Sequence, residues 1–305
     1  MTLPIYIIVG PTCIGKSSLA IKLAKKINAQ IINADSMQVY SNLNILTARP
    51  SKKDEKDVTH HLYGHVNGSE RYNVARWCYE ASDVINDCKN KNISTIIVGG
   101  TGLYIEKLIN GIFDIPPIPE KYKIESNNIL EREGIKNFLK IVKECDGKAV
   151  EKINPNDVNR LKRIWEVYNF TNITLSDWKK NNLKKFLIDP KYFLYLFLPD
   201  RKVNYERVDQ RFLNMIKNGA IKEVEELLNL NLDKSLPVMR AHGVPEITKY
   251  LNNQMNFDEC IKKCQQITRN YVKRQNTWWN SNLLKIHQKF TKFPDQISLK
   301  SINFN

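Results

Sequence analysis

The feature that most constrains this chain is the segment 10–17, GPTCIGKS, which fits the pattern G-x-x-x-x-G-K-[ST]. The preceding residues 5–9 (IYIIV) form a short β-branched run typical of a buried parallel strand. The following residues 17–27 carry apolar side chains at helical spacing and lysines between them. A strand, a glycine-containing loop and a helix in this order predict a phosphate-binding loop.

The chemistry of such a loop follows from its backbone. Glycines allow successive N–H groups to converge on one anion, and the helix N-terminus adds a partial positive charge. A lysine supplies a point charge for the outer phosphate oxygens, and the hydroxyl that follows it is suited to Mg²⁺. We therefore expect a di- or triphosphate to bind Gly10, Pro11, Thr12, Cys13, Ile14, Gly15, Lys16 and Ser17, with Ser17 as a ligand of Mg²⁺.

Strand and helix patterns alternate beyond the loop. Residues 30–33 and 93–98 are expected to be strands, 73–90 a helix between them, and 192–198 a further buried strand. This alternation predicts an α/β fold, with a P-loop core whose parallel sheet is flanked by helices. The pair at 60–61, His-His, has no metal-ligand pattern around it, so we expect a loop there.

The character of the chain changes at the proline-rich stretch 115–119, which is typical of a linker. The residues that follow are rich in lysine and asparagine and have helical periodicity, which predicts a helical insertion. We expect a discontinuous P-loop core over 1–116 and 190–287, a helical insertion over 117–189 and a loose tail over 288–305.

The charge balance indicates a polyanionic partner. The chain has 47 lysine and arginine residues against 32 acidic ones, a formal net charge of +15. Its 6 cysteines lack zinc spacing and predict reduced thiols in the cytoplasm. No apolar run approaches the ~20 residues that cross a bilayer, so we expect no membrane partner.

Two strand ends carry candidate catalytic side chains. The second expected strand ends at Asp35, and the third ends in Gly99-Gly100-Thr101 without an acid, which disfavours simple nucleotide hydrolysis. The carboxyl ends of parallel strands form the ligand crevice, so Asp35 and Thr101 should face the bound phosphates. Alternatively, Asp35 is a turn or N-cap aspartate and Thr101 a helix N-cap.

Taken in order, eight segments resemble the tRNA dimethylallyltransferases, in their bacterial form. These segments are GPTCIGKS (10–17), NADSMQVY (33–40), LTARP (46–50), IIVGGTGLYIEKLINGI (96–112), INPNDVNRLKRIWEVY (153–168), RVDQRF (207–212), MRAHGVPEI (239–247) and TRNYVKRQNTWW (268–279). The resemblance implies transfer of a dimethylallyl group from dimethylallyl diphosphate to N6 of the adenine 3′ to the anticodon, with release of diphosphate.

The resemblance also implies roles for single residues. Asp35 would be the general base that accepts the N6 proton, and Thr101 would hydrogen-bond the bridging oxygen or the adenine. Lys16, the loop amides and Mg²⁺ would neutralise the diphosphate. Arg207 and Arg211 lie four apart and resemble the lid arginines of phosphate-loop transferases, although a solvated basic face is the alternative.

The implied partner is the anticodon stem-loop of tRNA, whose target adenine must be flipped out of its stack. Backbone-binding cations and groups that contact the base should compensate for the lost stacking. The tryptophans at 165, 278 and 279 are expected in the core instead. The candidate contacts are Asp35, Ser36, Met37, Gln38, Thr101, Lys123, Asn159, Arg160, Leu161, Lys162, Arg163, Arg240 and His242.

Two alternatives share the phosphate loop. A small-molecule kinase would transfer the γ-phosphoryl group of ATP, but it would not account for the net charge of +15 or the basic insertion. An RNA-binding NTPase switch would account for the charge, but it would need a hydrolytic acid and a switch threonine. We expect a monomeric cytoplasmic transferase.

Overall fold

The computed structural model describes residues 3–181, 183–187 and 191–303. The chain divides into two compact units, of which the first is Met1–Ile109 with Phe186–Asn305 and the second is Asn110–Lys185. The expected boundary at 116/117 lies seven residues beyond the observed division at 109/110. The expected boundary at 189/190 lies outside the described residues. Each unit is described by itself below.

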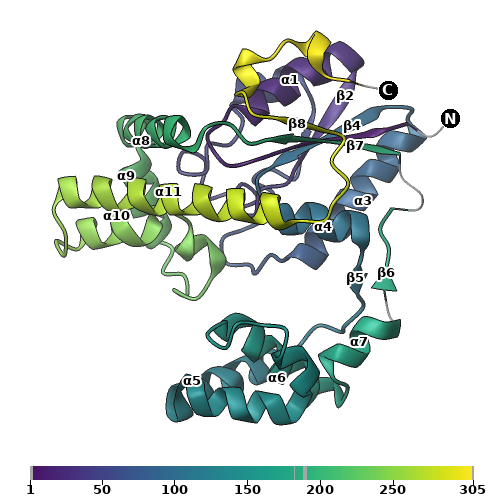
Figure 1. The fold of residues 1–305 in the computed structure, drawn as a ribbon. Helices are drawn as coiled ribbons and strands as arrows, with labels where there is room; N and C mark the ends of the chain where they lie inside the picture. The colour runs from purple at the N-terminus through teal and green to yellow at the C-terminus, as the bar shows by residue number, and fades with distance from the viewer. Residues whose placement is uncertain (1–2, 182, 188–190, 304–305) are drawn as a thin grey trace. The chain divides into compact units, whose positions relative to one another are not determined.

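The first unit is built on a six-stranded sheet in the order β3-β2-β4-β1-β7-β8, in which every pair is parallel (Figure 1). Its central strands are nearly continuous runs of Ile, Val, Leu and aromatic residues, as expected where helices cover both faces of a sheet. The α/β prediction is therefore confirmed. The strands are β1 (Ile5–Val9), β2 (Ala29–Asn33), β3 (His60–His61), β4 (Ser94–Gly99), β7 (Tyr192–Phe197) and β8 (Gln288–Phe290).

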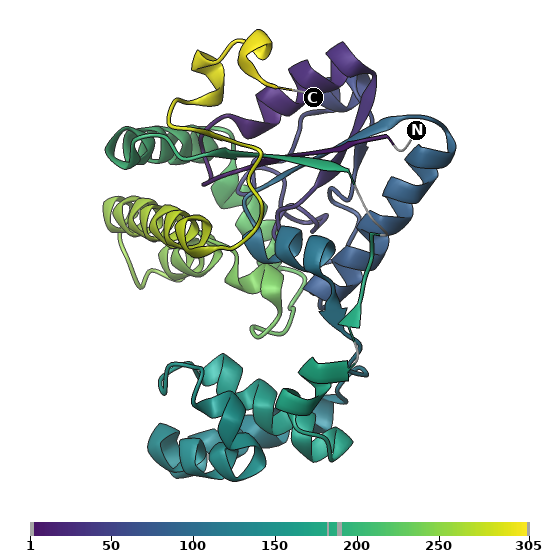
Figure 2. The ribbon, with the colours of Figure 1, turned by 45° about the vertical axis from the view of Figure 1, so that its right-hand side comes forward.

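Side chains of β1 alternate between two apolar layers. Ile5, Ile7 and Val9 belong to the larger cluster, which includes side chains of α3 (Val74–Asn90) and α4 (Gly102–Asn110). Tyr6 and Ile8 belong to the other cluster, which includes α1 (Lys16–Ile27). In Figure 2, α1 lies over one face of the sheet and α3 and α4 lie over the opposite face. The loop between β1 and α1 therefore connects two elements that are both packed into the core.

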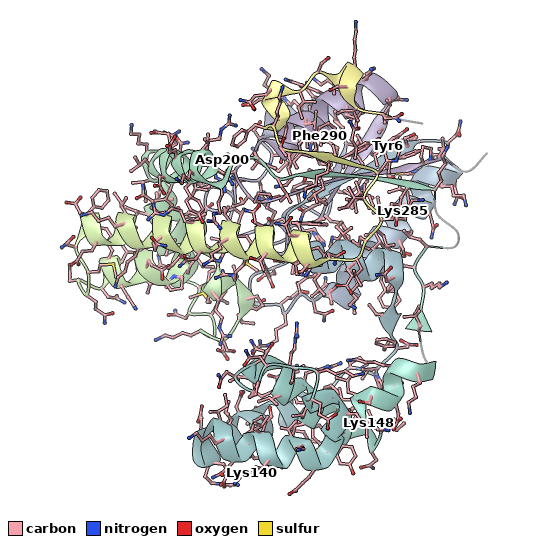
Figure 3. The ribbon with its side chains drawn as sticks, in the orientation of Figure 1. Tyr6, Lys140, Lys148, Asp200, Lys285 and Phe290 are labelled. Atoms are coloured by element: carbon pink, nitrogen blue, oxygen red, sulfur yellow. The ribbon has the colours of Figure 1, made fainter. Side chains whose placement is uncertain are left out.

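Two expectations about loops are wrong. His60–His61 forms the edge strand β3, which pairs with Ile31 and Ile32 of β2. The segment 288–305 is no loose tail over its described part, because β8 pairs with β7 and the ring of Phe290 stacks on that of Phe197 at 4.6 Å (Figure 3). It continues through the 3₁₀ helices η2 (Pro294–Gln296) and η3 (Leu299–Ser301).

The apolar side chains of this C-terminal segment explain its order. Phe293 and Ile302 are buried in the cluster that includes α1. Their burial removes apolar surface of α1 and β7 from water, which stabilises the docked segment.

Helices after β7 complete the first unit. Asp200 caps α8 by accepting hydrogen bonds from Lys202 and Val203 (Figure 3). The long helix α11 packs along α8, where Arg269 pairs with Asp209 at 2.6 Å. These elements are α8 (Arg201–Lys217), α9 (Ala220–Leu228), η1 (Pro237–Arg240), α10 (Val244–Leu251) and α11 (Phe257–Ser281); the short α2 (Lys52–Asp57) precedes β3.

The second unit is mainly helical, as predicted. Its core gathers Phe138, Leu161 and Trp165, so the expected core position of Trp165 is confirmed. Lys140 and Lys148 lie on its first helix (Figure 3). The helices are α5 (Glu120–Val150), α6 (Val158–Thr171) and α7 (Leu175–Asn181), and β5 (Ile112–Phe113) pairs antiparallel with β6 (Leu183–Lys184). Across the described residues, no helix combines the length and apolar character needed to cross a membrane.

Candidate functional site

The loop between β1 and α1 has the geometry of an anion site. Gly10 has φ +148°, and a Cβ there would lie 2.2 Å from the carbonyl oxygen of Phe197, so only glycine fits. Gly15 has φ 94° and precedes α1 without a side-chain cap. The first N–H groups of α1 are therefore available to a ligand, and the helix dipole favours a negative one.

A cavity of about 290 Å³ lies against this loop. Lys16, Ser17 and Asp35 line it, together with Thr12, Cys13, Gly15, Ser18, Gln38, Ala48, Val98, Gly99, Gly100 and Arg211. The ammonium group of Lys16 donates to the carbonyl oxygen of Pro11 at 2.6 Å. Burial lowers the pKa of Lys16 to about 8, and Arg211 lowers it as well, whereas Asp35 raises it. An anion bound here would raise the pKa of Lys16 again.

A second cavity, of about 240 Å³, adjoins the first. Part of its wall is apolar, formed by Met37, Leu46, Val208, Phe212 and Met215, and the rest is lined by polar and charged side chains such as Asp35, Arg240 and His242. Thr12, Asp35 and Arg211 line both cavities. The volume is below the ~300–1,000 Å³ typical of drug-sized ligands. A ligand with an anionic head and a short apolar group would fit across the two.

Sequence reasoning missed the apolar wall of this second cavity. Val208, Phe212 and Met215 recur at i, i+4 and i+7 on α8. This spacing marks an inward-facing stripe, but the stripe alone does not tell a cavity wall from ordinary core.

Asp35 is both a turn residue and a cavity residue. The buried amide of Asn33 accepts from the Asp35 N–H at 2.9 Å and donates to its carbonyl oxygen at 3.0 Å. Oδ1 of Asp35 accepts the Met37 N–H at 2.9 Å. Because this bond ends on Oδ1, Oδ2 is the oxygen that can take a proton from a ligand. The turn role of Asp35 is therefore compatible with its place on the cavity wall, and its catalytic role stays a prediction.

Thr101 joins the ends of β2 and β4. Its hydroxyl accepts the Ser36 N–H at 3.1 Å, and its own N–H donates to the carbonyl oxygen of Ala34 at 3.1 Å. A Cβ on Gly99 would lie 2.1 Å from the same carbonyl oxygen, so glycine permits this close approach. The two strand ends predicted to form the crevice are thus in contact.

The two candidate arginines on α8 have different surroundings. Arg211 donates to Oγ1 of Thr12 at 2.9 Å and lines both cavities. Arg207 pairs instead with Asp295 at 3.0 Å, and its guanidinium lies 3.7 Å from the ring centroid of Phe293. The structure therefore brings Arg211 to the phosphate loop and holds Arg207 on the C-terminal segment. The Cys13 thiol of the phosphate loop also donates to the carbonyl oxygen of Arg207 at 3.5 Å, so contact of both arginines with diphosphate stays a prediction.

Several candidate base contacts line the second cavity, namely Ser36, Met37, Arg240 and His242. The imidazole of His242 lies edge-on to the ring of Tyr271 at 4.6 Å. Burial lowers the pKa of His242, and Arg274 lowers it further, which favours the neutral form.

Gln38 supports a neighbouring loop. Its side-chain amide donates to the carbonyl oxygens of Thr47 at 2.8 Å and Ala48 at 3.0 Å. Glu223 holds the same loop by accepting three successive backbone N–H groups, those of 44–46. The donor group of Gln38 is thus already used, although the residue lines the phosphate cavity.

The candidate tRNA contacts of the second unit lie on α5 and α6. Lys123 pairs with Glu120 at 2.7 Å, and Lys162 donates to Asn127 at 2.8 Å. Arg160 pairs with Asp157 at 3.3 Å, and both Asn159 and Arg163 are exposed. Leu161 is a correction, because its side chain is 0% exposed in the helical core and cannot contact RNA.

The site suits Mg²⁺ only in company with phosphate oxygens. Among the described residues, no three His, Cys, Asp or Glu side chains come together as a metal group. Mg²⁺ in phosphate sites usually has few protein ligands and several water or phosphate ligands. The exposed hydroxyl of Ser17 lies in the phosphate cavity and fits that role.

Comparisons of the sequence with known proteins find relatives that cover most of the chain. The profile of the IPP transferase family matches residues 38–282, and that of the isopentenyl transferase family matches 3–66. The chain is 41% identical over 275 residues to the tRNA dimethylallyltransferase of Pelagibacter ubique, covering 90% of this chain and 87% of that protein. It is 40% identical over 277 residues to the tRNA dimethylallyltransferase of Bartonella henselae, covering 91% and 95%.

The solved structures that resemble this fold include enzymes of the same kind. A eukaryotic dimethylallyltransferase acting on tRNA has a TM-score of 0.78 and 28% identity, covering 91% of this chain and 70% of that one. The tRNA isopentenylpyrophosphate transferase of Bacillus halodurans has a TM-score of 0.68 and 27% identity, covering 97% and 92%.

Proposed function

The chain belongs to the IPP transferase family, and on that premise we propose that it transfers a dimethylallyl group from dimethylallyl diphosphate to tRNA. The acceptor is N6 of the adenine 3′ to the anticodon, and diphosphate is released. The observation that supports this most directly is that Thr12, Asp35 and Arg211 line both the phosphate cavity and the second cavity, part of whose wall is apolar. One substrate with an anionic head and a five-carbon group accounts for both cavities.

The diphosphate lies on the loop amides and the N-terminus of α1 in this proposal. Lys16 and Arg211 offset the charge that develops on the leaving group as the carbon–oxygen bond breaks. Mg²⁺, held by Ser17 and diphosphate oxygens, supplies further positive charge when bound. The phosphate loop thus holds a leaving group and transfers no phosphoryl group.

Asp35 is the proposed general base. The exocyclic amine of adenine is a weak nucleophile, so removal of a proton as the carbon–nitrogen bond forms lowers the barrier. Oδ2 of Asp35 takes that proton, while the Met37 N–H fixes Oδ1. Thr101 lies at the adjoining strand end, where its hydroxyl reaches the bridging oxygen or the base.

The anticodon stem-loop is the proposed RNA partner. A flipped adenine requires compensating contacts, and the residues around Asp35 that line the second cavity are suited to them. The exposed cations of α6 would contact the RNA backbone. We propose a monomeric enzyme of the cytoplasm; the six free thiols support the reducing compartment.

The relatives support prenyl transfer over the kinase alternative. The test is incubation with unmodified tRNA, Mg²⁺ and labelled dimethylallyl diphosphate, followed by mass analysis of the nucleosides. An adenosine heavier by one five-carbon unit is expected. Failure of transfer, together with consumption of ATP on a small acceptor, would contradict the proposal.

Asp35→Asn tests the base. We expect kcat to fall about 10²–10⁴-fold, because the amide cannot accept the proton. The affinities for donor and tRNA should remain within about twofold, because the substituted amide keeps an oxygen that can accept the Met37 N–H. Asp87→Asn, the same change on the exposed surface of α3, is the matched control. Full activity of the Asp35 variant would remove Asp35 from the mechanism.

A further inference from the structure

A buried amide joins the phosphate loop to the turn after β4. Gln275 of α11 is 5% exposed, and its Oε1 accepts the Thr12 N–H at 2.8 Å. Its Nε2 donates to the carbonyl oxygen of Gly100 at 3.0 Å. A polar side chain on the buried face of a helix calls for an explanation, since most such positions are apolar. Here the explanation is a bridge between two backbone segments of the site.

The surroundings leave this bridge little freedom. A Cβ on Gly100 would lie 2.2 Å from Nε2 of Gln275, so the amide fills the space that glycine leaves. Thr12 is also held at its carbonyl oxygen by Asn204 at 3.3 Å and at Oγ1 by Arg211 at 2.9 Å. Every polar group of Thr12 therefore has a partner from α8 or α11.

The same helix reaches Thr101. Tyr271 lies one turn before Gln275 on α11; burial raises the pKa of its hydroxyl, whereas the side chains of Thr101 and Gln275 lower it. Oγ1 of Thr101 already accepts the Ser36 N–H. A threonine hydroxyl has two acceptor positions and one proton. After the Ser36 N–H, one acceptor position and the proton of Thr101 remain, and they are shared between Tyr271 and a ligand.

We propose that Gln275 is a positioning residue that sets the spacing between the diphosphate site and Thr101, through its bonds to Thr12 and Gly100. This inference rests on the proposed prenyl transfer. The bond that breaks lies between the diphosphate, held by the loop, and the carbon attacked beside Asp35 and Thr101. A displacement of about 1 Å at such a centre can cost about 100-fold in rate.

The bridge requires one acceptor and one donor on the same planar group. A carboxylate at position 275 accepts the Thr12 N–H but opposes the Gly100 carbonyl oxygen, whereas a protonated carboxyl group makes both bonds. The charged or titratable groups around this position are Arg211 from α8, Lys16 from α1, Asp35 after β2, and Tyr271 and Arg274 from α11.

The test compares Gln275→Glu, Gln275→Met and wild type in kcat for prenyl transfer between pH 5.5 and 8.5. Gln266→Glu makes the same change at an exposed position of α11 and is the control. At pH 8 we expect Gln275→Glu to lose about 10- to 100-fold in kcat, with the KM for tRNA within about twofold of wild type. Its kcat relative to wild type should rise as the pH falls, whereas the ratio for Gln275→Met should stay low and flat.

A ratio for Gln275→Glu that does not change with pH would overturn the inference, as would full kcat in Gln275→Met with only a lower melting temperature. If the glutamate variant does not fold, the kcat of Gln275→Met still decides between positioning and bulk stability. Absence of transfer by the wild type would instead refute the proposed function, so the two failures are distinguishable.

Discussion

Raising the pH above 8 should weaken binding of dimethylallyl diphosphate through Lys16. Burial lowers the pKa of this ammonium group to about 8, with a further lowering by Arg211 and an opposing effect of Asp35. In the free enzyme, Lys16 is then about 90% protonated at pH 7 and about 10% protonated at pH 9. The charged form is the one that binds the diphosphate oxygens.

The size of the change in Kd with pH follows from the linkage between diphosphate binding and protonation of Lys16. A bound dianion or trianion beside Lys16 raises its pKa, so binding above pH 8 must be accompanied by proton uptake. The Kd should therefore be nearly constant below pH 8. Above pH 8 it should rise by about tenfold per pH unit, until the pH reaches the pKa of the bound complex.

Isothermal titration calorimetry in two buffers of different ionisation enthalpy measures both the Kd and the number of protons taken up on binding. We expect uptake of about 0.1 proton at pH 7 and about 0.9 at pH 9. Lys16→Arg is the matched control, because a guanidinium remains charged throughout this range, so its Kd should not change with pH. A wild-type Kd that is equal at pH 7 and pH 9, without proton uptake, would refute the argument from burial.

Two further predictions concern the remaining parts of the chain. Lys162→Ala combined with Arg163→Ala should reduce the slope of log Kobs for tRNA against log salt by about two if both contact phosphate, whereas Lys89→Ala with Lys91→Ala at the C-terminal end of α3 should leave it unchanged. An unchanged slope would make Lys162 and Arg163 ordinary surface charges. Phe293→Ala should lower the free energy of unfolding by about 3 kcal/mol in urea denaturation, because this ring is buried against α1. A loss below about 0.5 kcal/mol would mean that the segment contributes nothing to the core.

The central strands were predictable because their sequences carry a strong local signal. Residues 5–9, 93–98 and 192–198 are apolar runs bounded by turns or glycines, and each overlaps an observed strand. The edge strands β3 and β8 have two and three residues, too few for any periodicity. Their pairing is decided by the neighbouring strand, whose open edge accepts them.

Asp35 and Thr101 could be located because a topological rule places them. Parallel strands all point the same way, so residues just after neighbouring strands come together at one edge of the sheet. The contacts of Arg207 and Arg211 could not be predicted from such a rule. Their spacing places them on one face of α8, but Arg207 pairs with Asp295, 88 positions further along the chain. The sequence pattern of α8 therefore does not indicate that Asp295 is the partner of Arg207.

For Gln275, the sequence predicts burial but does not identify the hydrogen-bond partners. Helical spacing places it on one face of α11 with Cys264 and Trp279, both buried. A buried amide must find a donor and an acceptor, so the sequence requires two partners for Gln275. It does not specify which, because Thr12 lies 263 residues away and Gly100 lies 175 residues away. The phosphate loop can thus be recognised from eight consecutive residues, whereas the contacts that hold it in register with Thr101 exist only once α11 has packed against the sheet.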